Sequence, residues 1–182
     1  MKVLKWILII VLVLVLLLIA FLAYMGMILP LKINETKMGP YTIAYESFTG
    51  PYAETGPVFD KVYKALKAEG IGSTRGLGIY YDNPSNVPAD KLRSDCGVII
   101  EAADLAKFNK VRRKFKIKQI PQGDCVVVEF PLRNMLSYMM GPMKVYPTLM
   151  KYIQAKGYKV SMSYELYDEL QKKIYFVMGI TK

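Results

Sequence analysis

The sequence predicts an α+β domain made of two βαββ halves that follow one N-terminal transmembrane helix. Three observations support this fold class. The chain of 182 residues begins with a long apolar run that carries no charge. Glycine, proline and strand-like landmarks then recur at a nearly constant spacing, which is typical of an internal repeat. Within each repeat, apolar residues follow helical spacing in one segment and strand-like runs in the others.

The apolar run Trp6–Leu29 is bounded by Lys5 and Pro30. A helix of this length, rising about 1.5 Å per residue, spans a hydrocarbon core of about 30 Å with some tilt. A cleaved signal peptide is the alternative, but its apolar region is usually about 7–15 residues long and ends in an Ala-x-Ala-like site. We therefore expect a single-pass membrane protein with an uncleaved anchor over residues 1–30 and a domain over residues 31–182.

The side of the membrane that holds this domain stays open. Lys2 and Lys5 precede the apolar run, whereas Lys32 and Lys37 follow it beside Glu35. The positive-inside rule therefore favours a cytoplasmic N-terminus only weakly.

Four pairs of landmarks recur in the same order, at spacings of 84 to 87 residues. They are Gly39 with Gly123, Gly56-Pro57 with Gly141-Pro142, Gly70 with Gly157, and Ile79–Asp82 with Glu165–Asp168. In each half a glycine precedes the first strand, a Gly-Pro pair opens a helix, and a second glycine ends it. The repeat predicts halves at about 39–100 and 115–182, each with the order strand, helix, strand, strand.

In the first half, strands are expected at Tyr41–Phe48, Leu77–Tyr81 and Leu92–Glu101. The helix after the first strand is marked by an apolar stripe at helical spacing: Val58, Phe59, Val62, Tyr63 and Leu66. Pro57 suits the first position of this helix and Gly70 suits its C-terminal cap.

In the second half, the first strand is expected at Cys125–Phe130 and the helix between Gly141-Pro142 and Gly157. Pro147 marks either a kink or the true start of that helix. Residues 101–113 link the halves and have room for a short helix. Residues 115–120 alternate apolar and basic side chains, as an extra half-buried strand would.

Two such halves can pair about a pseudo-twofold axis, with both helices supporting one curved sheet. The junction between the halves would then form a concave surface. Ligand pockets favour such junctions because side chains from both halves converge there.

The composition excludes several kinds of active site. The chain has no histidine, which removes Ser-His-Asp and Cys-His catalysis and every His-ligated zinc site. No Walker A or G-x-G-x-x-G motif follows a strand. We expect no catalytic triad, no metal and no cofactor. Cys96 and Cys125 lie in apolar strand-like runs, where cysteine usually acts as a small buried hydrophobe, and a disulfide between them stays open.

The net charge is +10, from 25 basic and 15 acidic residues. The densest basic run is Lys110–Lys114, and it continues to Lys116 and Lys118. No recognised nucleic-acid-binding motif accompanies it. We therefore expect a solvated face, or one resting on anionic lipid headgroups, and no nucleic-acid partner.

Residues 161–167 alternate between two faces of an expected strand. One face carries Met162, Tyr164 and Leu166, and the other carries Ser161, Ser163, Glu165 and Tyr167. The repeat maps Glu165 onto Ile79 and Tyr167 onto Tyr81. A carboxylate inside an aromatic and aliphatic cleft is costly unless it is paired or serves a ligand. That ligand would be an organic cation or a polar donor held against aromatic rings. The alternative is an exposed Glu165 paired with one of the many lysines.

These segments resemble the GyrI-like small-molecule-binding domains, over about residues 39–180. The motifs that carry the resemblance are Tyr164-Glu165-Leu166-Tyr167, the turn Gly50-Pro51-Tyr52 and the loop Tyr80–Lys91. The loop is similar to that of a membrane-anchored eukaryotic member of the family. The resemblance implies the duplicated βαββ fold and a cleft that binds a small molecule. The residues expected to bind it are Glu165, Tyr81, Tyr52, Tyr146 and Tyr167.

Three functions are consistent with this sequence. The leading hypothesis is a membrane-anchored module that binds a small amphipathic or cationic molecule, with Glu165 opposing its charge. The second is a small-molecule hydrolase in which Glu165 is base or nucleophile and Tyr81 or Tyr146 donates a proton. The third is a protein-interaction platform at a membrane that uses the loop Tyr80–Lys91 as its contact surface.

Overall fold

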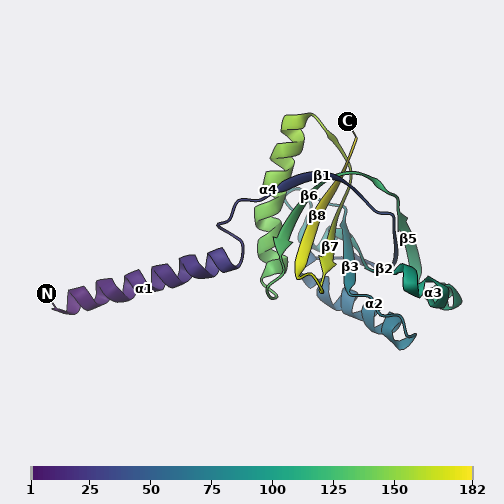
Figure 1. Cartoon of the computed structure of the whole chain (residues 1–182), viewed down its shortest axis with the longest axis horizontal. Coiled ribbons are helices and arrows are strands. Elements are labelled where there is room, and N and C mark those ends of the chain that lie inside the picture. The colour runs from purple at the N-terminus through teal and green to yellow at the C-terminus, as the bar shows by residue number, and fades with distance from the viewer. Residues whose placement is uncertain (1, 182) are drawn as a thin grey trace.

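The computed structural model describes residues 2–181, apart from the side chain of residue 111. Helix α1 extends away from a domain in which the α-helices α2, α3 and α4 accompany one curled antiparallel sheet (Figure 1). The α-helices of this described part are α1 (Lys2–Tyr24), α2 (Gly56–Ala68), α3 (Leu105–Val111) and α4 (Ser137–Lys156). Its strands are β1 (Ile33–Met38), β2 (Tyr41–Thr49), β3 (Arg75–Tyr80), β4 (Arg93–Ile99), β5 (Lys116–Ile120), β6 (Gly123–Pro131), β7 (Lys159–Asp168) and β8 (Lys173–Thr181).

Helix α1 is 23 residues long, and it is long and apolar enough to cross a membrane. None of the residues in its membrane-length window is buried. A signal sequence near the N-terminus has the same properties.

The eight strands follow the order β1-β6-β8-β7-β3-β4-β2-β5 across the sheet. The antiparallel pairing of β3 with β7 lies at the centre and joins the two halves. At the edges, β1 precedes β2 in the chain but pairs with β6, and β5 precedes β6 but pairs with β2. The segment before the first half therefore supplies β1, the edge strand of the second half. The segment before the second half supplies β5, the edge strand of the first half.

The α+β fold class predicted from the sequence is confirmed. The element order is β2-α2-β3-β4 followed by β6-α4-β7-β8, and the expected linking helix and extra strand are present as α3 and β5. Strand β1 was not predicted. Its exposed positions include Glu35 and Lys37, and such polar residues are typical of an edge strand that its neighbour's backbone holds in place.

Helix α2 forms as the sequence predicted. Pro57 lies in its first turn, where a missing N–H costs nothing, and Val62 and Leu66 are buried against the sheet. Gly70 takes the left-handed backbone conformation just past the helix, with φ of 72°.

Helix α4 begins earlier than predicted. The structure starts it at Ser137 rather than at Gly141-Pro142, so both Pro142 and Pro147 lie inside it. The side chain of Ser137 accepts a hydrogen bond of 2.9 Å from the backbone N–H of Arg133 and fixes the entry to the helix. A proline inside a helix removes a backbone hydrogen bond, so this helix depends on packing of its buried face against the sheet.

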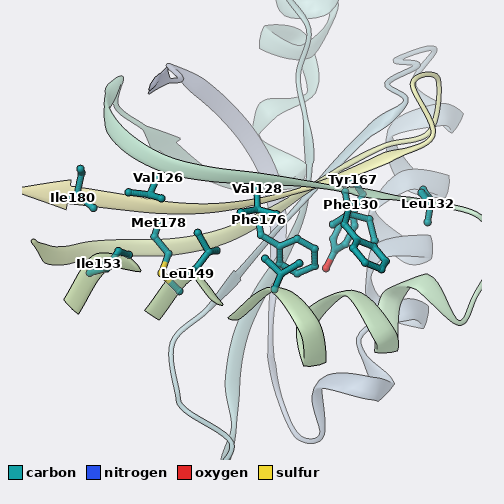
Figure 2. Packing of buried hydrophobic residues seen from close by; sticks show 12 residues of the cluster. Val126, Val128, Phe130, Leu132, Leu149, Ile153, Tyr167, Phe176, Met178 and Ile180 are labelled. Carbon is teal, nitrogen blue, oxygen red and sulfur yellow. The ribbon is translucent and has the colours of Figure 1, made fainter. Parts of the chain in front are cut away.

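That packing forms a core between α4 and the second half of the sheet. The residues of this cluster are Val126, Val128, Phe130 and Leu132, then Val145, Leu149 and Ile153 from α4, then Tyr167, Ile174, Phe176, Met178 and Ile180. Figure 2 shows Leu149 and Ile153 on α4 facing the strands that carry Val128, Phe176 and Met178.

A second apolar cluster lies on the other face of the sheet, which α2 and α4 do not cover. Its buried members come from both halves: Ile43, Leu77, Ile79, Ile99, Ile120, Cys125, Val127, Tyr164, Leu166 and Val177. The curl of the sheet brings these strands together around their own side chains. We refer to this surface as the uncovered face and to the surface beneath α2 and α4 as the helix-covered face.

The close approach of α4 to the sheet depends on Gly141, which is buried. A Cβ atom at this position would lie 2.9 Å from Cζ of Phe176 and 3.2 Å from Cδ1 of Phe130. We therefore predict that Gly141→Ala lowers the free energy of unfolding by about 1–3 kcal/mol, as overpacking of a core does. Denaturant unfolding of the full chain in detergent micelles measures it.

The matched control is Gly56→Ala, at the first residue of α2, because a Cβ there meets no atom within 4 Å. We expect this change to stay within about 0.5 kcal/mol of the wild type. An equal loss in both variants would contradict the close-packing argument for Gly141.

Candidate functional site

Glu165 lies in β7 on the helix-covered face, with only 4% of its surface exposed. Tyr146 of α4 donates a hydrogen bond of 2.8 Å to Oε1 of Glu165. Tyr167, two residues along β7, donates one of 2.8 Å to Oε2. Both oxygens of a buried carboxyl group are therefore satisfied by tyrosine hydroxyl groups, one from a helix and one from the sheet.

Tyr80 at the end of β3 extends this network across the central strand pairing. Its hydroxyl lies 2.7 Å from that of Tyr167. Tyr167 uses its only hydroxyl hydrogen in the hydrogen bond to Glu165, so Tyr80 is the donor in the bond between the two tyrosines. Gly78 lies opposite Glu165 in the ladder, and a Cβ there would lie 2.9 Å from the ring of Tyr80. The missing side chain of Gly78 thus gives Tyr80 the space to reach the network.

Aromatic rings enclose the network. Phe59 of α2 and Tyr138 of α4 meet the ring of Tyr167 edge-on, with centroids 5.5 Å and 5.4 Å away. Phe176 of β8 meets the ring of Tyr146 in the same way at 5.5 Å. Tyr167 lies beside Phe130 and Phe176 in Figure 2. The two tyrosines that hold the carboxyl group are therefore packed against rings from both helices and from the sheet.

Burial raises the pKa of Glu165 to about 7, against the opposing effect of the hydrogen bonds from Tyr146 and Tyr167. Within residues 2–181 no lysine or arginine forms an ion pair with this carboxyl group. Near neutral pH the group is therefore divided between its neutral and its ionised form. Burial, and then the charge of Glu165, also raise the pKa values of Tyr80, Tyr146 and Tyr167, so their hydroxyl groups remain donors.

The structure brings three of the five expected binding residues together: Glu165, Tyr146 and Tyr167. Tyr52 lies one ring away, because its ring meets that of Tyr80 with centroids 4.8 Å apart. Its hydroxyl donates to the carbonyl oxygen of Asp82 at 2.9 Å and so fixes the loop after β3.

Tyr81 lies apart from the others, at the rim of the uncovered face. Its hydroxyl donates a hydrogen bond of 2.6 Å to Asp95, which is also paired with Lys118. Of the two tyrosines that the hydrolase hypothesis names as proton donors, only Tyr146 lies beside Glu165. Binding by any of these residues stays a prediction.

Tyr80 is the residue of the network that the sequence reasoning missed. The spacing of 86 residues maps Tyr167 onto Tyr81, whereas a spacing of 87 maps it onto Tyr80. The glycines that end the two helices, Gly70 and Gly157, are 87 residues apart and lie just before these strands. Because a shift of one residue turns a strand's side chains to the opposite face, this spacing was the signal to follow.

The two cysteines are buried and free. Cys96 pairs with Gly78 in the ladder, and Gly78 pairs with Glu165, so Cys96 belongs to the helix-covered face. Cys125 belongs to the cluster of the uncovered face. The disulfide that the sequence left open is therefore not formed in this structure, since the two thiols lie on opposite sides of the sheet.

A family model for the GyrI-like small-molecule-binding domain matches residues 31–175. The chain belongs to the GyrI-like family. The family predicted from the sequence is thus confirmed, and this family binds small molecules.

Two curated relatives are similar over 90% of this chain. Human testis-expressed protein 264 is 28% identical over 172 residues, and its mouse homolog is 26% identical over 171 residues. The chain spans about half of their length, 53% in each case.

Solved structures share the GyrI-like fold at low sequence identity. The C-terminal domain of EcmrR superposes with a TM-score of 0.57 and 12% identity, over 84% of this chain and 98% of that domain. SAV2435, in a structure bound to tetraphenylphosphonium, superposes with a TM-score of 0.50 and 12% identity, over 84% of this chain and 94% of SAV2435.

The raised pKa of Glu165 makes the stability of this GyrI-like domain depend on pH. Between the unfolded value of 4.5 and the folded value of about 7, the folded state keeps a proton that the unfolded state has lost. Raising the pH through this window therefore lowers the free energy of unfolding, on the order of 3 kcal/mol for this group. We predict that Glu165→Gln removes this loss, so that the free energy of unfolding of the variant rises relative to that of the wild type from pH 4.5 to pH 7.

Denaturant unfolding at a series of pH values, on the full chain in micelles, measures this difference. Glu54→Gln is the control, because it changes an exposed carboxylate and leaves the buried one in place. If the Glu165→Gln difference is constant across the window, the raised pKa is wrong.

Proposed function

We propose that this protein is a membrane-anchored GyrI-like module that binds a small amphipathic or cationic molecule between its two halves, with Glu165 opposing the positive charge. The observation that carries this proposal is a buried carboxyl group held by two tyrosine hydroxyl groups, with no ion pair to it among the described residues. Such a group costs folding free energy that a ligand's charge would offset.

The surroundings of Glu165 favour an organic cation over a metal ion. Its neighbours within the network are Tyr80, Tyr146 and Tyr167, and the next shell is Phe59, Tyr138 and Phe176. Aromatic faces attract a desolvated cation by about 2 kcal/mol or more, and they bury the apolar groups attached to it. The solved structure of SAV2435 with tetraphenylphosphonium supports the choice of an aromatic cation as the first ligand to test.

The site is closed in this structure, because Glu165 and Tyr167 expose only 4% and 8% of their surfaces. A ligand would enter by displacing the elements that cover it, and the half-exposed Tyr138 near the start of α4 is the outermost ring. Helix α4 suits such a movement, since two prolines remove backbone hydrogen bonds inside it.

The anchoring part of the proposal rests on α1. The helix is long enough and apolar enough to cross a bilayer, and it is not covered by the domain. If α1 is not cleaved off as a signal sequence, it would hold the binding domain at a membrane surface, where amphipathic molecules concentrate.

The first test is calorimetric titration of the full chain in micelles with tetraphenylphosphonium. We predict that Glu165→Gln weakens binding by at least about 1.5 kcal/mol, roughly tenfold, because it removes the charge that faces the cation. Tyr175→Phe is the matched control, since the hydroxyl of Tyr175 donates to Gln171 and its ring packs on the cluster of the uncovered face. Unchanged affinity in the Glu165→Gln variant would show that Glu165 does not interact with the bound cation.

A second prediction concerns the pH dependence of the same titration. A cation binds the ionised form of Glu165, which dominates above its pKa of about 7. Affinity for tetraphenylphosphonium should therefore rise between pH 6 and about pH 8 and then level off. The Glu165→Gln variant has no such proton to lose, so its affinity should stay flat. A wild-type affinity that is independent of pH would argue against charge pairing at this carboxyl group.

A further inference from the structure

The domain is docked onto the end of α1 rather than joined to it by an extended linker. Met25, directly after α1, has none of its surface exposed, and its sulfur accepts a hydrogen bond from the side chain of Asn134. Lys144 of α4 donates to the carbonyl oxygens of Gly26, at 2.6 Å, and Leu29. These contacts hold the first part of α4 against the segment that leaves α1.

The cation of Arg133 adds a further contact, 5.1 Å above the ring of Tyr24 at the last residue of α1. Figure 1 shows α4 running across the direction of α1. Transmembrane helices tilt by about 20° on average from the bilayer normal. If α1 crosses a bilayer in this way, α4 lies roughly parallel to the membrane surface and close to it.

The outer face of α4 and the residues just before it is apolar, which is unusual for a helix that faces water. Its exposed members are Met135, Leu136, Met139, Met143 and Met150, with exposed fractions of 80%, 42%, 59%, 69% and 51%. Grouped apolar side chains of this size on a surface indicate an interaction site.

The charges on this segment have one sign. From Arg133 to Lys159 the sequence contains no aspartate or glutamate, whereas Lys144, Lys151 and Lys156 lie within α4. Basic residues beside an apolar helical face are typical of helices that lie in the interface of an anionic membrane. Flexible methionine side chains adapt readily to such an irregular environment.

We infer that the outer face of α4 lies in the headgroup region of the same bilayer that α1 crosses. Its methionines would contact the upper acyl chains, and Lys151 and Lys156 would contact anionic headgroups. This inference rests on the membrane anchoring in the proposed function and adds a second membrane contact to it. Tyr138 and Tyr146 lie on the same helix, so an amphiphile dissolved in the lipid would meet the helix that covers Glu165.

Fluorescence quenching by brominated lipids tests this arrangement with the full chain in vesicles that contain anionic lipid. The wild type has a single tryptophan, Trp6, which reports whether α1 is in the bilayer. In a Trp6→Phe background, Met143→Trp reports on the outer face of α4. The matched control is Leu105→Trp, an exposed apolar position on α3, which lies at the end of the domain away from α1 in Figure 1.

We expect quenching of Trp6 and of the tryptophan at position 143, and none of the tryptophan at position 105. Zwitterionic lipid alone should lessen the quenching at position 143, because the lysines lose their partners. If Trp6 is quenched but the tryptophan at position 143 is not, the second membrane contact is wrong. A blue-shifted but unquenched emission at position 143 would also overturn it, because it would show that a second copy of the chain, and not lipid, covers this face. If Trp6 itself is not quenched, the anchor fails and the inference fails with it.

Discussion

The antiparallel pairing of β3 with β7 joins the two halves, and the candidate site is built on it. Glu165 faces Gly78 across this pairing, so a carboxyl group from one half lies opposite an empty position in the other. Tyr80 and Tyr167, from opposite strands, meet over the gap and connect the halves through their hydroxyl groups. The helices α2 and α4 then close over a site whose position is set by the ladder beneath them.

This arrangement places a costly group at the centre of the domain. A hydrophobic residue at position 165 would fit the surrounding rings without the desolvation penalty of a carboxylate. The two tyrosine hydroxyl groups reduce that penalty, but the pKa of about 7 indicates that they do not remove it. A residue that works against stability in an otherwise well-packed region is typical of a functional site rather than of a structural one.

Much of the fold could be predicted from the sequence because its signals are local. The alternation around Glu165, the Gly-Pro opening of α2 and the apolar α1 each specify their own segment. The site was harder, because the difference between Tyr80 and Tyr81 is a single residue of register, which only the strand pairing fixes. The start of α4 and the presence of β1 were missed for a related reason. Packing against β6 and β8 stabilises a helix with two prolines, and pairing with β6 holds a polar edge strand.

The exchange of edge strands also determines how the domain would carry mechanical load. A pull along α1 reaches the domain first at Met25 and Gly26, which are docked on α4 and on the end of β6. It then passes into the ladder between β1 and β6, starting at Ile33 and Val128. Two more strand pairings, β6 with β8 and β8 with β7, separate this ladder from Glu165 on β7. Tension on the anchor would therefore load β1 and β6 before it reached the central joint.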